Sequence, residues 1–174
     1  MLECKIHAAN DLRVLESPMP VPGPGEVLVR LGAAGICGSD MHYYAHGRVG
    51  QFVIREPLAR GHGGAGVVAG IGDGVTRVRP GQWIAINPSH PCGRCAACRE
   101  GRENLCSQMR FLGSASVFPP VQGLFREYFL MPERQCVPLP DDALADLSLG
   151  ELAMAERLSV PLTSAPRAGT PLGR

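Results

Sequence analysis

Four closely spaced cysteines constrain this chain more than any other feature of its sequence. They form a C-x2-C-x2-C-x7-C array made of Cys92, Cys95, Cys98 and Cys106. Soft thiolate ligands select zinc or an iron–sulfur cluster, and four within tetrahedral reach close a structural zinc site. Disulfides or incidental buried thiols are the alternatives, but the stretch PCGRCAACREGREN is too polar to bury four free thiols. The array therefore predicts a zinc ion that holds a loop and leaves no open coordination position for chemistry.

The rest of the composition is that of an ordinary globular chain. Its 174 residues allow one domain with at most a stub of a second, and 45% hydrophobic residues suffice for a core. A formal net charge of +1 gives no electrostatic reason to expect nucleic acid or a membrane surface as a partner. No stretch reaches the apolar length of a membrane span, and the start MLECKIHAANDLRV lacks the layout of a signal peptide. Seven cysteines without a secretion signal favour a reducing compartment, so we predict a cytoplasmic protein.

Strand patterns dominate the chain. Short apolar, β-branched runs are found at Val27–Leu31, Gly66–Ile71, Trp83–Ile86 and Tyr128–Met131. Proline and glycine mark turns at Pro18–Gly25, Gly72–Gly74, Pro80–Gly81 and Pro119–Gly123. Many short strands at this spacing predict a mainly β fold, either a small barrel or a partly open sandwich.

Helical patterns are limited to two segments, Gly38–Tyr44 and Ala143–Leu158. Pro161 follows the second segment and would clash with the carbonyl of Arg157, so we expect that helix to end or kink there. The tail from Thr163 to Arg174 contains two further prolines and little apolar surface. We expect this tail to be poorly ordered.

A second set of candidate ligands lies outside the quartet. Cys37 and His62 could come from separate strand ends and bind zinc with a position left open for water or substrate. Asp40 could orient the histidine through its free N–H, and Ser39 with His42 could relay a proton to solvent. Each residue also has an ordinary structural interpretation: a small core residue for Cys37, a turn histidine for His62 and a helix N-cap for Ser39.

These motifs together resemble the N-terminal, GroES-like catalytic domain of the zinc-dependent medium-chain alcohol and polyol dehydrogenases. The similarity covers about residues 20–160, and its most specific parts are the quartet, G-I-C-G-S-D-M-H at 35–42, G-H at 61–62 and V-x-P-G-Q at 78–82. The stretches at 47–52 and 86–89 resemble the sorbitol and L-idonate branch. Residues 109–115 and Phe118-Pro119 look most like the L-idonate 5-dehydrogenases. The resemblance implies a partly open GroES-like barrel with short helices and a structural-zinc loop at 92–106.

The resemblance also implies roles for individual residues. Cys37 and His62 would bind a catalytic zinc, while Ser39 and His42 would relay the proton and Asp40 would steady His62. The zinc would polarise a small polyol or sugar-acid substrate while hydride leaves to NAD or NADP. Three aromatic residues would line the substrate cleft or serve as ordinary core residues: Tyr43, Tyr44 and Phe111.

The sequence departs from the family pattern around these residues. Gly63 stands where the family motif G-H-E-x-x-G-x-V has glutamate, which removes an anionic donor. The other acidic candidate ligand is Glu156, in a stretch that resembles the family's A-E-P-L-S-V. The proline of that motif is here Arg157, whose guanidinium could pair with Glu156 and compete with the metal. Arg60 replaces an apolar residue, so we expect it either to reach water or to shift the local packing, because a buried unpaired guanidinium costs several kcal/mol.

No nucleotide-binding unit is recognisable in the sequence. Residues 61–66 spell G-x-G-x-x-G, but the β-branched Val67-Val68 follows where a helix should start, and no acidic residue occurs at 82–90. We therefore expect a catalytic domain at 1–155 and, at 156–174, a linker leading to an absent nucleotide-binding domain. NAD or NADP would bind only if a separate chain supplied that domain.

Two functions remain open at this point. One is a truncated polyol or sugar-acid dehydrogenase, inactive without a nucleotide-binding partner. The other, motivated by Gly63 and Arg157, is a non-enzymatic zinc-binding module that keeps only the quartet.

Overall fold

The computed structural model describes residues 1–140 and 147–169 and is built mainly from short strands. The strands are β1 (Leu2–Ala8), β2 (Asp11–Glu16), β3 (Glu26–Ala34), β4 (Arg48–Val49), β5 (Phe52–Val53), β6 (Leu58–Ala59), β7 (Gly64–Ile71), β8 (Trp83–Ile86), β9 (Ser89–His90), β10 (Arg110–Phe111), β11 (Tyr128–Pro132) and β12 (Cys136–Pro138). The helices are α1 (Gly38–His46), α2 (Ala96–Arg99), α3 (Leu149–Leu152) and α4 (Ala155–Arg167), with 3-10 turns η1 (Glu103–Leu105) and η2 (Glu133–Gln135).

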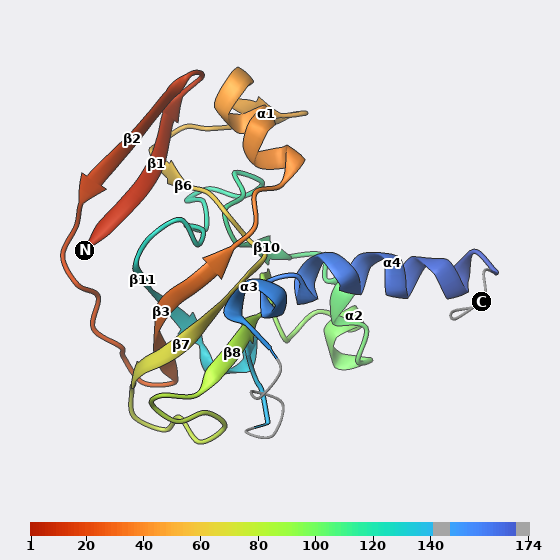
Figure 1. Ribbon diagram of the computed structural model, residues 1–174. Helices are drawn as coiled ribbons and strands as arrows, with labels where there is room; N and C mark the ends of the chain where they lie inside the picture. The colour runs from red at the N-terminus through yellow and green to blue at the C-terminus, as the bar shows by residue number, and fades with distance from the viewer. Residues whose placement is uncertain (141–146, 170–174) are drawn as a thin grey trace.

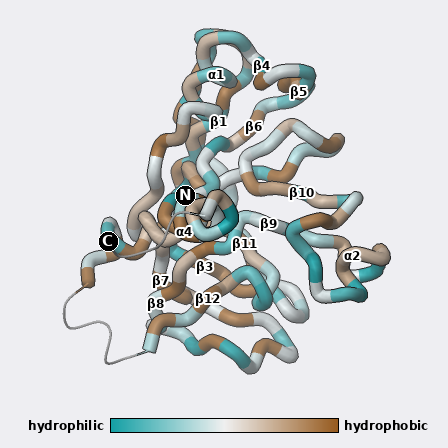
Figure 2. The backbone as a smooth tube through the Cα atoms, turned by 90° about the vertical axis from the view of Figure 1, so that its right-hand side faces the viewer, coloured by the Kyte–Doolittle hydropathy of each residue, from teal (hydrophilic) through white to brown (hydrophobic). Residues whose placement is uncertain are grey.

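The core lies against a five-stranded antiparallel sheet of order β11-β3-β7-β8-β12. Alternate side chains of a strand point to one face, and this alternation puts Val27 and Val29 of β3 inside with no exposed surface. Directly opposite them on β11 stand Met131 and Phe129, which are also fully buried. Such cross-strand apolar pairs stabilise the sheet and fix its register. In Figure 2, β7, β8 and β12 lie close together, and hydrophobic residues, coloured brown, recur along this part of the backbone.

A second, three-stranded sheet of order β2-β1-β6 closes part of the barrel. The β1–β2 hairpin stands apart from the large sheet in Figure 1. It is tied to the segment before β11, since the Cys4 N–H donates to the Phe125 carbonyl (2.8 Å) and the Glu127 N–H donates to the Leu2 carbonyl (3.0 Å). The result is the mainly β fold that the strand pattern predicts, in the form of the partly open barrel that the family resemblance implies.

The helical segment near the C-terminal end differs in part from expectation. Residues 143–146 of the predicted helix lie outside the described residues, and the remainder forms α3 and α4. Helix α4 continues through Pro161 and Pro166 to Arg167, so the expectation that the helix ends at Pro161 was wrong, and the alternative of a kink there stays a prediction. The helix is exposed along its length, and a carbonyl that loses its N–H partner to proline can be hydrated there.

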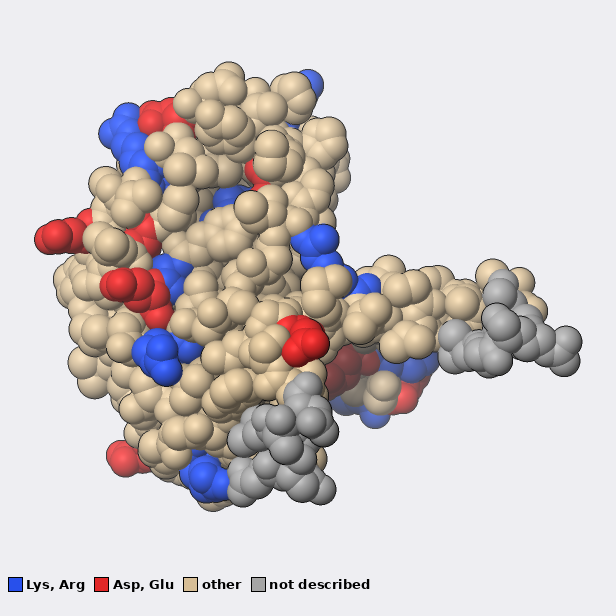
Figure 3. Space-filling model, in the orientation of Figure 1, with Lys and Arg blue, Asp and Glu red and all other residues tan. Residues whose placement is uncertain are grey.

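The same helix corrects the expectation of a poorly ordered tail. Residues 163–167 are helical and 168–169 are also described, whereas 170–174 lie outside the described part. Helix α4 projects from the body as an arm, and its visible face is mostly uncharged (Figures 1 and 3). Its apolar side chains at Leu158, Val160 and Leu162 are each more than half exposed.

Neither a nucleotide-binding unit nor a membrane span is present in the described part. Every strand pair formed by residues 1–140 and 147–169 is antiparallel, whereas a βαβ unit needs parallel neighbours. Of the helices described, none has the length and apolar character needed to cross a bilayer.

Candidate metal centre

The four cysteines of the quartet converge as predicted. Their sulfur atoms all lie within 4.8 Å of one another, with Cys95 and Cys98 sulfurs 3.5 Å apart and Cys92 and Cys98 sulfurs 4.0 Å apart. A tetrahedral zinc with Zn–S bonds of about 2.3 Å requires sulfur–sulfur distances of about 3.8 Å. The thiols therefore fit a zinc ion without rearrangement of the loop.

The local backbone explains why these thiols meet. Gly93 and Gly101 both have φ of +72°, a left-handed conformation that reverses the chain at little cost only for glycine. Cys95 directly precedes the short helix α2, and Cys106 directly follows η1, so two of the sulfurs stand at the ends of these short helical turns. Peptide N–H groups of Cys92 and Gln108 both donate to the Cys106 sulfur at 3.3 Å. These donors stabilise thiolate and prepare the loop for a cation.

Acidity within the quartet is uneven. Hydrogen bonds from the backbone of Cys98 and Ser107 lower the pKa of Cys95 to about 6. Desolvation and the neighbouring Cys95 sulfur raise the pKa of Cys98 to about 12. A metal must bind four thiolates here, so zinc binding would release the protons that the less acidic thiols still hold.

The second set of candidate residues is spread over several elements. Cys37 is the N-cap of α1, and Ser39, Asp40 and His42 lie within that helix. His62 lies between β6 and β7, where its ring contacts Phe111 with centroids 5.5 Å apart. Glu156 lies in the first turn of α4. Among the described residues, the quartet is the group of ligand atoms that gathers closely enough to hold one metal ion, and Cys37, His62 and Glu156 do not form such a group.

Three segments nevertheless meet around Gly63. The Gly35 N–H donates to the Gly63 carbonyl at 2.9 Å, which places the chain leading into Cys37 beside the His62 segment. A Cβ added at Gly63 would lie 2.8 Å from Oε2 of Glu156. The carboxylate of Glu156 thus lies against the backbone at the position where the family motif has its own acidic side chain.

Asp40 is held by other partners than the predicted one. Its carboxylate accepts the Cys37 N–H (2.8 Å) and the Gly61 N–H (3.3 Å), and it pairs with the Arg60 guanidinium at 2.9 Å. No hydrogen bond joins Asp40 to His62 within residues 1–140 and 147–169, and the role of Asp40 in steadying His62 stays a prediction.

Arg60 neither reaches water nor stays unpaired in the interior. It is only 2% exposed, yet it pairs with Asp40, donates to the Ser39 hydroxyl at 3.1 Å and stacks 4.0 Å above the Tyr43 ring. Burial lowers the pKa of Arg60, while the Asp40 carboxylate opposes that change. Its Nε and Nη1 atoms have no hydrogen-bond partner in the described part of the chain. The guanidinium is therefore a buried, paired anchor between α1 and the His62 segment.

Arg157 also takes a partner of its own. It donates to the backbone carbonyl of Ile36, and its guanidinium lies over Gly35. No ion pair between Arg157 and Glu156 is found among the described side chains. The carboxylate of Glu156 consequently remains available near Gly63.

The aromatic candidates are unequally placed. Tyr43 is 2% exposed, and its hydroxyl accepts the Ala115 N–H at 3.1 Å. Tyr43 is therefore a core residue in this structure. Tyr44 is exposed, and half-buried Phe111 contacts His62. Their predicted contact with substrate stays a prediction.

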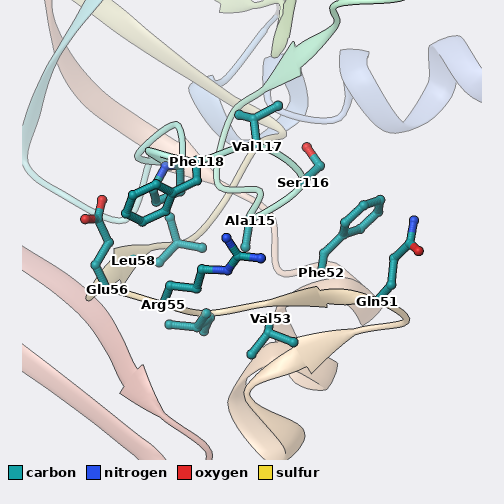
Figure 4. Close-up of a pocket in the computed structure, with 12 residues that line it drawn as sticks. Gln51, Phe52, Val53, Arg55, Glu56, Leu58, Ala115, Ser116, Val117 and Phe118 are labelled. Atoms are coloured by element: carbon teal, nitrogen blue, oxygen red, sulfur yellow. The ribbon is translucent and has the colours of Figure 1, made fainter.

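A pocket near this region was missed by the sequence reasoning. It has a volume of about 310 Å³ and lies between residues 51–58 and 115–120. In Figure 4, Arg55 extends toward the Phe118 ring, and the two groups are 5.9 Å apart. The available signal was the family resemblance of residues 47–52, 109–115 and Phe118-Pro119, because Gln51, Phe52, Ala115 and Phe118 of these stretches line this pocket.

Comparison with known proteins decides the family. Residues 23–141 match the alcohol dehydrogenase GroES-like domain. The chain belongs to this family. Its GroES-like domain is similar to sorbitol dehydrogenase of Gallus gallus, with 40% identity over 168 residues that make up 97% of this chain and 45% of the relative. It is 46% identical over 171 residues to L-idonate 5-dehydrogenase (NAD(P)(+)) of Escherichia coli K12, covering 98% of this chain and 48% of the relative.

Solved structures agree with the fold. The crystal structure of L-idonate 5-dehydrogenase from Escherichia coli K-12 matches with a TM-score of 0.85 and 40% identity, covering 97% of this chain and 46% of the other. The predicted resemblance to zinc-dependent medium-chain dehydrogenases and the GroES-like fold are thereby confirmed. The chain spans somewhat less than half the length of these relatives.

Proposed function

We propose that this chain is the zinc-binding catalytic domain of an NAD(P)-dependent polyol or sugar-acid dehydrogenase similar to L-idonate 5-dehydrogenase. In this proposal the nucleotide-binding part lies outside these 174 residues, and the chain is inactive without it. The two-domain boundary at 155/156 and a cytoplasmic location remain parts of the same proposal.

The observation that carries the proposal is the meeting of three ligand-bearing segments at Gly63. Cys37, His62 and Glu156 supply a thiolate, an imidazole and a carboxylate, which is a donor set suited to catalytic zinc with an open position. The Gly35–Gly63 hydrogen bond and the contact of Glu156 with Gly63 bring these segments together. Since Cys37, His62 and Glu156 do not form a converged group among the described residues, their side chains would need to rotate to share one ion.

Zinc bound at this site would act as a Lewis acid on the substrate oxygen. The chain's own groups would handle the proton. Ser39 accepts a hydrogen bond from Arg60, so its own O–H proton remains free to be donated onward. His42 lies three residues beyond Ser39 on the same helix and is exposed, so it can pass a proton to solvent.

Substrate class follows from the relatives. Those that match most of this chain are described as sorbitol dehydrogenase, D-xylulose reductase A and L-idonate 5-dehydrogenase. These descriptions share substrates with several hydroxyl groups or their keto forms. We therefore propose a small polyol or sugar acid as substrate and NAD or NADP as hydride acceptor, held by a separate nucleotide-binding chain.

Complementation tests this function. The purified chain would be incubated with L-idonate or sorbitol and either NAD or NADP, alone and with the nucleotide-binding half of the Escherichia coli L-idonate 5-dehydrogenase. We expect NADH or NADPH only in the combined sample, and its loss with Cys37→Ser. Turnover by the chain alone would overturn the need for a partner, and no turnover in any combination would count against the dehydrogenase assignment.

One observation favours a second candidate function, a non-enzymatic zinc-binding module. Only the quartet converges among the described ligands, and Gly63 lacks the acidic side chain of the family motif. Metal analysis separates the two functions. One zinc per chain supports the module, whereas two would exclude it.

A further inference from the structure

Two histidines of α1 form a cluster that the proposed reaction does not require as a pair. His42 and His46 are four residues apart on one helix, and their ring centroids lie 5.9 Å apart with planes tilted by 36°. Side chains at i and i+4 stand one above the other on the same helix face. Both histidines are exposed at the tip of the molecule where α1 lies (Figures 1 and 2).

The helix that carries them is firmly anchored. Tyr43, between the two histidines, is buried and accepts the Ala115 N–H. The Asn10 N–H donates to the Tyr44 carbonyl at 2.6 Å, which joins the helix to the β1–β2 hairpin. Gly47 ends the helix in a left-handed conformation, and its N–H donates to the Tyr43 carbonyl at 2.9 Å. The backbone positions that carry the two imidazoles are therefore fixed before any ligand arrives.

We propose that His42 and His46 form a two-histidine binding site for a divalent transition-metal ion of the Ni²⁺, Cu²⁺ and Zn²⁺ class, separate from the quartet. Two histidines at i and i+4 on one helix face are a known arrangement for binding one metal ion. With metal–nitrogen bonds of about 2.1 Å, two imidazoles on adjacent positions of one ion have centroids about 5 Å apart. The observed 5.9 Å needs only a small rotation of one ring.

The surroundings set the strength of the site. The two histidines line a shallow depression with Arg48, Val49 and Gly50, and this lining contains no carboxylate. Water must fill the other coordination positions, and the positive charge of Arg48 opposes the cation. The site should therefore bind a metal reversibly, in contrast to the closed quartet. Imidazole ligands favour the later first-row ions over Mg²⁺ or Ca²⁺.

A bound ion would also exclude another use of His42. An imidazole nitrogen that ligates a metal cannot accept a proton, so metal at this pair and a proton relay through His42 are mutually exclusive. The metal site itself stands on geometry alone and does not depend on the proposed reaction.

Calorimetric titration with Ni²⁺, in mildly alkaline buffer, tests the site without any measurement of activity; the full chain is first loaded with zinc and then freed of weakly held zinc by gel filtration. We expect one Ni²⁺ per chain, with affinity lowered at least about tenfold in His46→Gln and in His42→Gln. His7→Gln is the control, because it removes a half-buried imidazole of β1 and should leave the affinity unchanged. Circular dichroism of each variant checks that α1 stays folded.

A charge variant sharpens the result. Arg48→Ser should tighten Ni²⁺ binding, by about twofold at low salt, because it removes a nearby positive charge at an exposed position. Binding that is equally strong in His46→Gln, or equally weakened by His7→Gln, would overturn the site. Absence of Ni²⁺ binding by the unsubstituted chain would overturn it as well.

Discussion

The quartet and the Gly63 region both gather metal-ligand side chains, but they are assembled in opposite ways. All four quartet cysteines come from one loop, whose left-handed glycines and peptide N–H donors already direct the sulfurs to one point. The Gly63 region draws Cys37, His62 and Glu156 from three distant segments, and their ligand atoms do not converge to the same degree. A metal site whose ligands all come from one loop is complete once that loop folds. A site whose ligands come from several segments forms only when those helices and strands pack together.

Loss of one quartet thiol should have the largest effect. Cys106→Ser removes a ligand of a closed zinc site, and we expect it to lose that zinc and to destabilise the domain by about 5 kcal/mol or more. Thermal unfolding together with zinc analysis measures both effects. Cys4→Ser is the matched control, since Cys4 is a half-buried free thiol outside the quartet. Equal losses in the two variants would mean that the quartet holds no structural ion.

The buried pair of Arg60 and Asp40 should come next. Arg60→Leu leaves the Asp40 carboxylate buried without its cation, and we expect a loss of about 3 kcal/mol in the free energy of unfolding. Asp40→Asn combined with Arg60→Leu should cost less than the sum of the two single changes, because the lone buried charge is then absent. Urea unfolding of the four proteins gives the coupling. Strict additivity would show that the pair does not hold α1 against the His62 segment.

A smaller effect is expected at the capping box before α3, which leads into α4 and Glu156. The Ser148 hydroxyl accepts the Glu151 N–H (3.2 Å), and Glu151 accepts the Ser148 N–H (2.8 Å). Ser148→Ala should cost about 1 kcal/mol, the usual effect of losing an N-cap. The cost should depend on pH.

The sign of that dependence follows from Glu151. Hydrogen bonds from Ser148 lower the pKa of Glu151 below its ordinary value of 4.5. The carboxylate therefore contributes stability above pH 4.5 and loses it as the pH falls through the lowered pKa. The difference between the unsubstituted chain and Ser148→Ala should shrink on acidification. A difference that grows toward acid pH would contradict the capping-box account.

The smallest change in stability is expected at Gly63. Gly63→Ala places a methyl group 2.8 Å from the Glu156 carboxylate, which can rotate away, so unfolding should change by less than about 1 kcal/mol. Zinc retention in the Gly63 region should fall, because Glu156 is displaced. Gly70→Ala is the control, as its added Cβ meets only ordinary contacts with Leu28. Equal zinc retention in both variants would remove Glu156 from the site.

The same contrast explains how much the sequence could predict. The strands at Val27–Leu31 and Trp83–Ile86 and the helix at Gly38–Tyr44 were found because their patterns are local. The β1–β2 hairpin was missed, since β2 is mostly exposed and carries little apolar signal. Pro161 was misjudged because the argument from its missing N–H ignored hydration of an exposed helix.

Prediction of the sites from the sequence likewise succeeded for local features and failed for contacts between distant segments. Spacing alone located the quartet, because its ligands need only the loop. The partner of Arg60 was not predictable, since Asp40 is 20 residues earlier in the chain and meets Arg60 only through packing of α1. Likewise, the approach of Glu156 to Gly63 depends on the placement of α4, which no local pattern encodes.

The zinc content of the purified chain, before and after brief treatment with a mild chelator, tests the central claim most directly. After gel filtration has removed weakly held ions, we predict two zinc ions per chain, of which the chelator removes one. Cys37→Ser should start with one ion and keep it, whereas Cys106→Ser should lose the resistant ion. A single zinc in the unsubstituted chain, or removal of the quartet ion first, would contradict the account of one closed and one open metal site.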